Sequence, residues 1–328
     1  MVLCVAAMLF SVRLGSLRIS VKEVVRAIFD LENENRQIIW NIRFPRTLVA
    51  GLVGICLSLS GAILQGVMGN PMASPGIIGV SSGAGLAAVI ILVLLPDYYY
   101  LVTPFAFLGA LGATVLIYFL AWKDGINPLR LILSGIAVSS FLGAGINTLM
   151  IFFPDRVHGV MTFMVGGLSA RTWKHFYSLW SYTAAGTVLS IIMSHKLNIL
   201  MLGDEVAISL GLKVEQTRMI FIALASLLAA SAVSIVGLLG FVGLIVPHIT
   251  RLIIGSDQRY LIPASAIFGA ALLMVCDTIA RIIMDPIEIP VGIIMSALGA
   301  PFFLYLLRKD LKSRGSIKPK RAKTKIKA

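Results

Sequence analysis

The feature that most constrains this fold is an uncharged run of membrane length that begins directly after two arginines. Residues 47–69 carry no charged side chain over 23 residues. As an α-helix the run would be about 35 Å long at ~1.5 Å per residue, which is enough to cross the roughly 30 Å hydrocarbon core of a bilayer. We therefore predict a membrane-spanning helix here.

This predicted span is polar on part of its surface and ends in a sharp break. Its small and polar members are Gly51, Gly54, Ser58, Ser60, Gly61, Gln65 and Gly66. Such residues occur where a membrane helix packs closely on others or lines a water-filled cavity. The following segment 70–76, NPMASPG, contains two prolines and a glycine, so the backbone must leave helical geometry there. The combination indicates a transport path rather than a simple anchor.

Apolar segments continue along almost the whole chain. With 58% hydrophobic and 13% charged residues, and a mean hydropathy of +0.93, the composition is that of a polytopic membrane protein. We predict an all-α fold with about ten transmembrane helices in a single membrane domain, residues 1–310, followed by a basic tail, 311–328, that we expect to be disordered. The other clear spans are 76–95, 101–122, 129–153, 175–194, 261–284 and 291–307.

Two segments need a more specific interpretation. Residues 219–250 are uncharged over 32 positions and dense in glycine near the centre, which favours one span followed by a short or broken second one. Residues 1–12 would make a helix only about 18 Å long. The first span must therefore continue past Arg13 or begin upstream, unless the segment is a signal peptide, which the absence of a basic start and a small-residue cleavage site disfavours.

The positive charge is concentrated at one end. Of the net charge of +13, the segment 308–328 contributes +9, from ten Lys or Arg and one Asp. A basic tail beside a final span belongs in the cytoplasm, where it can touch anionic lipid, and it lacks the aromatic residues that stack on nucleic acid. Ten spans would put both termini in the cytoplasm. The loop 13–46 would then lie outside despite seven Lys or Arg, which suggests that its charge has a function.

Several sequence blocks together resemble the FecCD/BtuC-like permeases, the transmembrane subunits of type II ABC importers for iron-siderophores, haem and vitamin B12. The blocks are RFPRTL at 43–48, SGAILQGVMGNPMASPGIIGVSSGAG at 60–85, GDEVAISLGL at 203–212, GFVGLIVPHITRLI at 240–253, DTIAR at 277–281 and EIPVGIIMSALGAPFFLYLL at 288–307. The resemblance implies a homodimer or a pair with a close paralogue, two separate cytoplasmic ABC ATPase subunits and an extracytoplasmic substrate-binding protein.

Three arginines are candidates for contacting that binding protein. Arg43 and Arg46 are three positions apart and would share a helical face, where they could receive carboxylates. The resemblance implies that Arg43, Arg46 and Arg281 receive glutamates from the two lobes of the binding protein. The alternative is that they extend to lipid headgroups as ordinary interfacial arginines.

The segment 203–211 has the chemistry of a short helix on the membrane surface. Asp204 and Glu205 would occupy the first turn, where negative charge is favourable, and Gly211 would end the helix after Gly203 begins it. Val206 and Leu210 would form a small apolar knob that could enter a groove on another protein. The resemblance implies that this is the helix coupled to the ATPase; an ordinary surface loop is the alternative.

The remaining candidates concern the pathway and the buried acids. The resemblance implies that the connection 123–130 lies where the translocation pathway narrows towards the cytoplasm. The candidates for lining the pathway are Gln65, Asn127, Pro128, Leu129, Ser139 and Asn147. Asp277 and Glu288 lie near the ends of the last two spans. These acids could couple transport to protons. A structural salt bridge between Asp277 and Arg281, one helical turn apart, is the simpler explanation. His248 has no ligand spacing with the other histidines, and we predict no metal site and no cofactor.

The predicted function is a permease subunit that is not itself an enzyme. No G-x-x-x-x-G-K-[ST] motif occurs, so ATP hydrolysis must come from a partner subunit. The expected cargo is an iron-siderophore or a similar bulky chelate such as haem or cobalamin, imported through the cell membrane. The alternative is a secondary transporter driven by an ion gradient, which would account for the broken span and the acids near the membrane.

Overall fold

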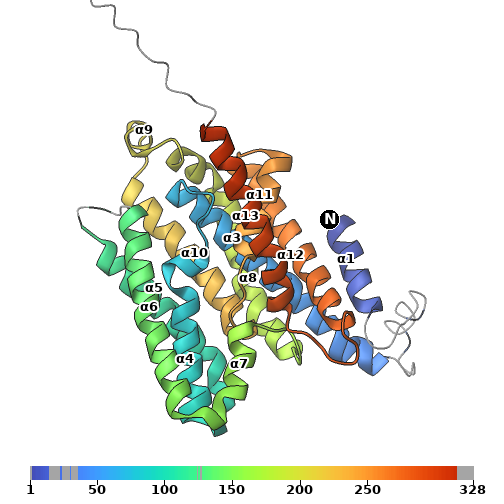
Figure 1. Cartoon of the computed structure of the whole chain (residues 1–328). Coiled ribbons are helices and arrows are strands. Elements are labelled where there is room, and N and C mark those ends of the chain that lie inside the picture. Colours follow the sequence, from blue (N-terminus) through green and yellow to red (C-terminus); the bar gives the residue numbers. More distant parts are fainter. Residues whose placement is uncertain are drawn as a thin grey trace, which may run out of the picture.

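A computed structural model describes residues 2–14, 23, 30, 36–123, 125 and 128–315 (Figure 1). These residues form helices and no β-strand. The helices are α1 (Val2–Arg13), η1 (Ile38–Arg43), α3 (Phe44–Met68), η2 (Pro75–Ile78), α4 (Val80–Leu94), η3 (Pro96–Leu101), α5 (Val102–Ala121), α6 (Pro128–Phe152), η4 (Pro154–Arg156), α7 (Val157–Val165), α8 (Trp173–Leu200), α9 (Asp204–Ser209), α10 (Val214–Val236), α11 (Val242–Ile254), α12 (Gln258–Ile282) and α13 (Val291–Gly315).

The predicted number of spans agrees with this architecture. Within the described ranges, ten helices have at least 12 residues: α1, α3, α4, α5, α6, α8, α10, α11, α12 and α13. Five spans are long and apolar enough to cross a membrane by length and composition, and four shorter helices are also apolar. The all-α membrane fold predicted from the sequence is therefore confirmed.

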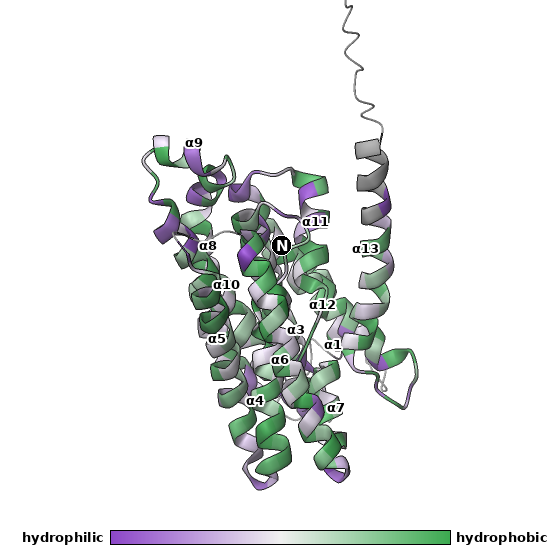
Figure 2. Ribbon diagram, turned by 60° about the vertical axis from the view of Figure 1, so that its left-hand side comes forward, coloured by the Kyte–Doolittle hydropathy of each residue, from purple (hydrophilic) through white to green (hydrophobic). Residues whose placement is uncertain are grey.

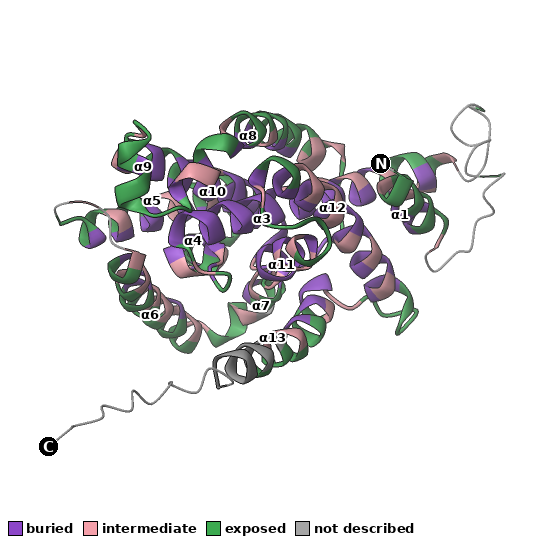
Figure 3. Cartoon of the chain, turned by 90° about the horizontal axis from the view of Figure 1, so that it is seen from above, coloured by how far each residue is buried: buried purple, intermediate pink, exposed green. Residues whose placement is uncertain are grey.

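Helix α3 lies at the centre of the bundle. It packs against α12, α10, α8 and α11, and Figure 3 shows it surrounded by other helices. In its most apolar window 83% of the residues are buried, against 22% in α6 at the periphery. The small residues predicted to allow close packing do so, because the backbones of α3 and its neighbours touch. A Cβ added at Gly54 would lie 2.1 Å from the carbonyl oxygen of Gly269 in α12.

The long uncharged run 219–250 is broken in two, as predicted. Helix α10 ends at Val236, Gly237 has a positive φ of 81°, and α11 begins at Val242. The break is not caused by Pro247, which lies inside α11. Phe241 adopts the left-handed conformation with φ of 66°, which is uncommon for a residue with a side chain.

The backbone at the break is hydrogen-bonded to α7 and to the linker that follows α7. The amide of Leu238 donates to the carbonyl of Phe163 at 2.9 Å, and the amide of Gly167 donates to the carbonyl of Val236 at 2.8 Å. The amide of Gly292, at the start of α13, donates to Gly166 at 3.1 Å. Irregular backbone at membrane depth requires such internal partners, because lipid offers none.

Two boundaries differ from the sequence-based expectations. Helix α1 ends at Arg13 and does not include Leu14, so the predicted continuation of the first span is not part of this helix, and residues 15–22 lie outside the described part. Helix α13 continues past residue 310 to Gly315, whereas the rest of the predicted tail, 316–328, lies outside the described residues.

Polar residues gather at the two ends of the bundle and apolar residues along its walls (Figure 2). One end carries α9 and the connection between α11 and α12. The opposite end carries η3, the start of α3 and the connection between α12 and α13 (Figure 1). The arginines at 43 and 46 and the short helix at 204–209 therefore lie at opposite ends of the molecule.

Candidate functional site

The three arginines predicted to act together do converge, at the end of the bundle opposite α9. Arg43 and Arg46 lie where η1 passes into α3, and Arg281 lies in the last turn of α12. Two acids join them: Asp277 in α12 and Glu288 in the loop before α13. We call these five residues, Arg43, Arg46, Asp277, Arg281 and Glu288, the arginine cluster.

Asp277 is the centre of the arginine cluster. It is 1% exposed and lies 2.9 Å from Nη2 of Arg46 and 3.2 Å from Nε of Arg281. Nη1 of Arg46 also contacts Oε2 of Glu288 at 2.8 Å. The salt bridge between Asp277 and Arg281 was predicted from their spacing of four residues. The pairing of Asp277 with Arg46, 231 positions away, was not predicted, because no local sequence pattern indicates it.

All three arginine side chains are buried in this conformation. Arg43 donates to the carbonyls of Val12 and Arg13 at the end of α1, at 2.9 and 3.1 Å. Arg281 donates from Nη2 to the hydroxyl of Ser11 at 2.8 Å. The arginine cluster thus also joins α1, α3 and α12 at one end of the bundle, a structural role that the sequence did not indicate.

Glu288 is the exposed member of the arginine cluster, with a side chain 44% accessible. Partial burial alone would raise the pKa of this carboxyl. The hydrogen bond and the charge of Arg46, with a further hydrogen bond from Ser169 at 3.0 Å, outweigh that effect and hold the pKa below its ordinary value of 4.5. Glu288 is therefore a carboxylate at neutral pH.

At the opposite end, the predicted surface helix is present as α9. Gly203 and Gly211 flank it with φ values of 98° and 80°, conformations that favour glycine. Asp204 pairs with Arg218 of α10 at 2.7 Å, and Glu205 is exposed beside it. This ion pair ties the short helix to a long one, so that a displacement of α9 would be transmitted to α10.

Helix α9 and the residue after it expose more apolar side chains than the sequence suggested. Val206 and Leu210 are 45% and 58% exposed, and Ile208, which the spacing of the other two did not single out, is 63% exposed. Ala207 points inward and is fully buried. A cavity of about 410 Å³ lies beside Ile208, between α9 and the start of α10. Val206 and Leu210, four positions apart, lie on one side of the helix and Ile208 lies on another. The apolar side chains that α9 exposes on both sides suit a partner groove that encloses it.

The pathway candidates fall into two groups. On α6, Leu129 and Asn147 are exposed on one face, since 18 residues make five turns. Pro128 begins α6 and is half-buried, and Ser139 accepts a hydrogen bond from Ser82 of α4 at 3.0 Å. Asn127 lies outside the described residues.

Gln65 is placed differently from the α6 candidates. It is 3% exposed, and its side-chain oxygen accepts a hydrogen bond from Arg251 of α11 at 2.9 Å. Its amide nitrogen lies 3.4 Å from the carbonyls of Gly243 and Leu244. In this conformation Gln65 therefore joins α3 to α11 inside the subunit. His248, also in α11, lies edge-on to the ring of Phe302 of α13.

The sequence matches a family model over nearly its whole length. The model of the FecCD transport family matches residues 3–309. The Fe(3+)-citrate import system permease protein YfmE of Bacillus subtilis is 40% identical over 314 residues, covering 95% of this chain and 94% of the relative. The hemin transport system permease protein HmuU of Yersinia pestis is 37% identical, covering 96% and 95% of the two chains.

Another relative and a solved structure point the same way. The cobalamin import system permease protein BtuC of Halobacterium salinarum is 41% identical over 281 residues, covering 85% of this chain and 76% of the relative. The fold is also that of a solved ABC transporter assigned to the metal-chelate type and captured in an inward-facing conformation. The two match with a TM-score of 0.86 at 29% identity, covering 94% of this chain and 97% of the other.

Proposed function

Since this chain belongs to the FecCD transport family and is the membrane permease subunit of an ABC importer, we propose that its cargo is a ferric chelate, with an iron-siderophore as the first candidate. Relatives at similar identity are permeases for ferric citrate, hemin and cobalamin. These cargoes are bulky metal complexes. The permease itself hydrolyses nothing; separate ATPase subunits supply the energy.

One observation carries the mechanism: the arginine cluster and α9 lie at opposite ends of the same bundle (Figure 1). An importer driven by ATP needs a surface for the substrate-binding protein outside and another for the ATPase inside. We assign the arginine cluster to the outside and α9 to the cytoplasm, with both chain termini also cytoplasmic.

The arginine cluster supplies the charge that an acidic partner would recognise. Its three guanidinium groups exceed its two carboxylates by one positive charge, and the exposed carboxylate of Glu288 lies on the outer side of Arg46. A glutamate of the binding protein would replace Glu288 as the partner of Arg46 while Asp277 stays in place. This exchange retains a charge-assisted hydrogen bond on each side of Arg46.

The other end would receive the ATPase through the exposed apolar side chains of α9 and of Leu210 at its end. Val206, Ile208 and Leu210 would enter a groove on the ATPase subunit, and the ion pair of Asp204 with Arg218 would pass the resulting movement to α10. A second copy of this chain would complete the importer as a homodimer. The exposed face of α6, with Leu129 and Asn147, would contribute to the path between the two copies.

Binding of the cognate substrate-binding protein to the assembled permease and ATPase tests the outer assignment. Glu288→Gln should tighten binding, because it removes a competing carboxylate and leaves Arg46 paired with Asp277. Arg43→Gln should weaken it about five- to tenfold, as expected for one charge-assisted contact, and should reduce the dependence on salt. Arg130→Gln, at the other end of the bundle in α6, is the control of equal charge change.

The outcome is decisive in both directions if the complex is first shown to assemble. Affinities that are identical for wild type, Glu288→Gln and Arg43→Gln would remove the arginine cluster from the docking surface. Affinity lost equally in Arg130→Gln would show a general charge effect instead.

A separate variant tests the assignment of α9 as the contact for the ATPase. Ile208→Asp places a charge on the most exposed of the three apolar side chains, Val206, Ile208 and Leu210, and should release the ATPase subunits during purification of the complex. Ser256→Asp, which adds the same charge at the same end but on the connection between α11 and α12, should leave them bound. Retention of the ATPase by Ile208→Asp would exclude α9 as its contact.

A further inference from the structure

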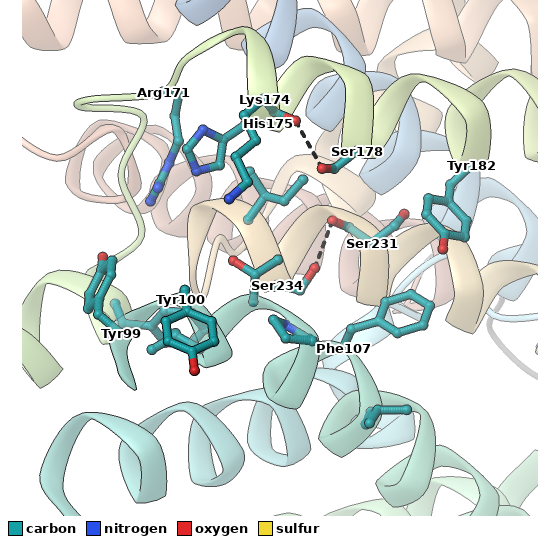
Figure 4. Close-up of a pocket in the computed structure, with 16 residues that line it drawn as sticks. Tyr99, Tyr100, Phe107, Arg171, Lys174, His175, Ser178, Tyr182, Ser231 and Ser234 are labelled. Atoms are coloured by element: carbon teal, nitrogen blue, oxygen red, sulfur yellow. Dashed lines mark hydrogen bonds between the residues drawn. The ribbon is translucent and has the colours of Figure 1, made fainter. Parts of the chain in front are cut away.

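A cavity with a cationic end lies apart from the arginine cluster and α9. Its volume is about 680 Å³, within the range of small-molecule sites. Helices α5 and α8 form its walls, and α10 closes the floor with Ser231, Ser234 and Ile235. Figure 4 shows Arg171, in the linker before α8, and Lys174, in the first turn of α8, extending towards Tyr99 and Tyr100 of η3.

Within the described part of the chain, the two cations at this end have no acidic partner. Among the described residues, no carboxylate lies within ion-pair distance of Arg171 or Lys174; the described ion pairs involve Arg46, Arg218, Arg259 and Arg281. The buried Nε of Arg171 also has no hydrogen-bond partner there. Burial lowers the pKa of this guanidinium, and only the nearby Tyr99 acts against that effect. An anion bound here would supply the missing charge and acceptor.

The other end of the cavity is apolar and open along the outer wall of the bundle. The rings of Phe107 in α5 and Tyr182 in α8 meet with centroids 5.7 Å apart, so they bridge the two walls. Leu108, beside Phe107, is 62% exposed. Both α5 and α8 pack on α10, and Figure 3 shows them at the perimeter, where a membrane helix faces lipid.

We propose that this cavity binds an anionic phospholipid, with its phosphate between Arg171 and Lys174 and an acyl chain along Phe107 and Leu108. A guanidinium and an ammonium are the side chains that recognise a phosphate, and aromatic residues mark the depth of the headgroups. A free anion would use the cationic end alone and would leave the apolar half unfilled. This proposal depends on the proposed function only for the choice of leaflet. With the arginine cluster outside, the lipid would belong to the outer leaflet.

The linker 166–172 connects this site to the arginine cluster. Ser169, two residues before Arg171, donates to Glu288, and Trp173 donates from its ring nitrogen to the carbonyl of Trp40 at 2.8 Å. A lipid bound to Arg171 would therefore restrict the motion of the linker beside Glu288. We expect the lipid to stabilise the outer end of the subunit.

Native mass spectrometry of the purified complex, exchanged into nanodiscs or micelles with defined lipids, tests the proposal. The wild-type complex should retain phosphatidylglycerol in preference to phosphatidylcholine. Arg171→Gln combined with Lys174→Gln should lower retained phosphatidylglycerol by about 25- to 100-fold, since two charge-assisted contacts are lost and each is expected to contribute roughly five- to tenfold. Lys196→Gln, which removes one charge from the other end of α8, should retain it, and Arg171→Lys with Lys174 intact should retain most of it.

The wild-type protein gives a second readout that needs no variant. Its thermal unfolding temperature should rise with phosphatidylglycerol and stay unchanged with inorganic phosphate or phosphatidylcholine. Equal stabilisation by inorganic phosphate would make the cavity a site for free anions and overturn the lipid assignment. Equal retention of the two lipids, or retention that does not change in the double variant, would also overturn it.

Discussion

Asp277 is the residue on which the arginine cluster depends, because among the described residues it is the carboxylate that pairs with both Arg46 and Arg281. Replacing Asp277 with Asn should destabilise the subunit by about 3–5 kcal/mol, since two buried cations lose their shared partner. The unfolding temperature of the purified complex should fall accordingly. Asp155→Asn, an exposed acid in η4, serves as the control and should leave that temperature unchanged.

Glu288 should make part of the stability dependent on pH. Its pKa in the folded protein lies below the ordinary value of 4.5, so its contribution is present above about pH 4.5 and is lost as the pH falls through the folded pKa. The effect should be small, because the side chain is 44% exposed and solvent screens it. Unfolding temperatures measured between pH 3 and 7 should show a step that Glu288→Gln removes; the same step in the variant would assign it to other groups.

At the scale of the element, the position of α3 depends on glycine contacts between helix backbones. A Cβ added at Gly61 would lie 1.8 Å from the carbonyl oxygen of Gly243 in α11, so the helices would have to separate. Gly61→Ala should therefore cost about 1–3 kcal/mol and reduce the yield of folded protein. Gly112→Ala in α5 adds the same methyl group where no heavy atom lies within 4 Å, and a stability equal to that of Gly61→Ala would contradict this account.

In the peripheral helix α6, unlike α3, apolar residues are largely not buried within the subunit. Only 22% of the most apolar window of α6 is buried, although its composition resembles that of a buried span. A membrane protein can leave such a face to lipid or to another subunit, so apolar composition alone does not identify the core. The small and polar residues of α3, rather than its hydropathy, predicted that it packs closely on other helices or lines a cavity, and the structure places it among α12, α10, α8 and α11.

At the scale of the whole molecule, the orientation in the membrane is open to direct measurement. In a background with Cys4→Ser, where Cys56 and Cys276 are buried, single cysteines can be placed at Glu288 and at Ser209 of α9. A membrane-impermeant maleimide should label the cysteine at 288 in intact spheroplasts. The cysteine at 209 should react only after the membrane is opened, and the reverse pattern would invert the proposed topology.

Much of the architecture could be predicted from local sequence. The number of spans, the break within 219–250 and the flanking glycines of α9 follow from hydropathy, glycine and proline, which act over a few residues. The salt bridge between Asp277 and Arg281 could also be predicted from local sequence, since a helix brings residues four positions apart together. The family was recognisable because several such local blocks occur in one chain.

Only the tertiary structure could decide which distant groups meet. Arg46 pairs with Asp277 across 231 positions, and Gln65 contacts Arg251 across 186. Arg171 reaches a cavity between α5 and α8, and no carboxylate of the described residues pairs with it there. Sequence alone determined that this chain forms membrane helices with polar ends, because burial of the backbone in lipid allows little else. The packing of those helices determined which buried charges are neutralised within the subunit and which can accept an outside ligand, because these pairings depend on contacts between helices and not on spacing along one.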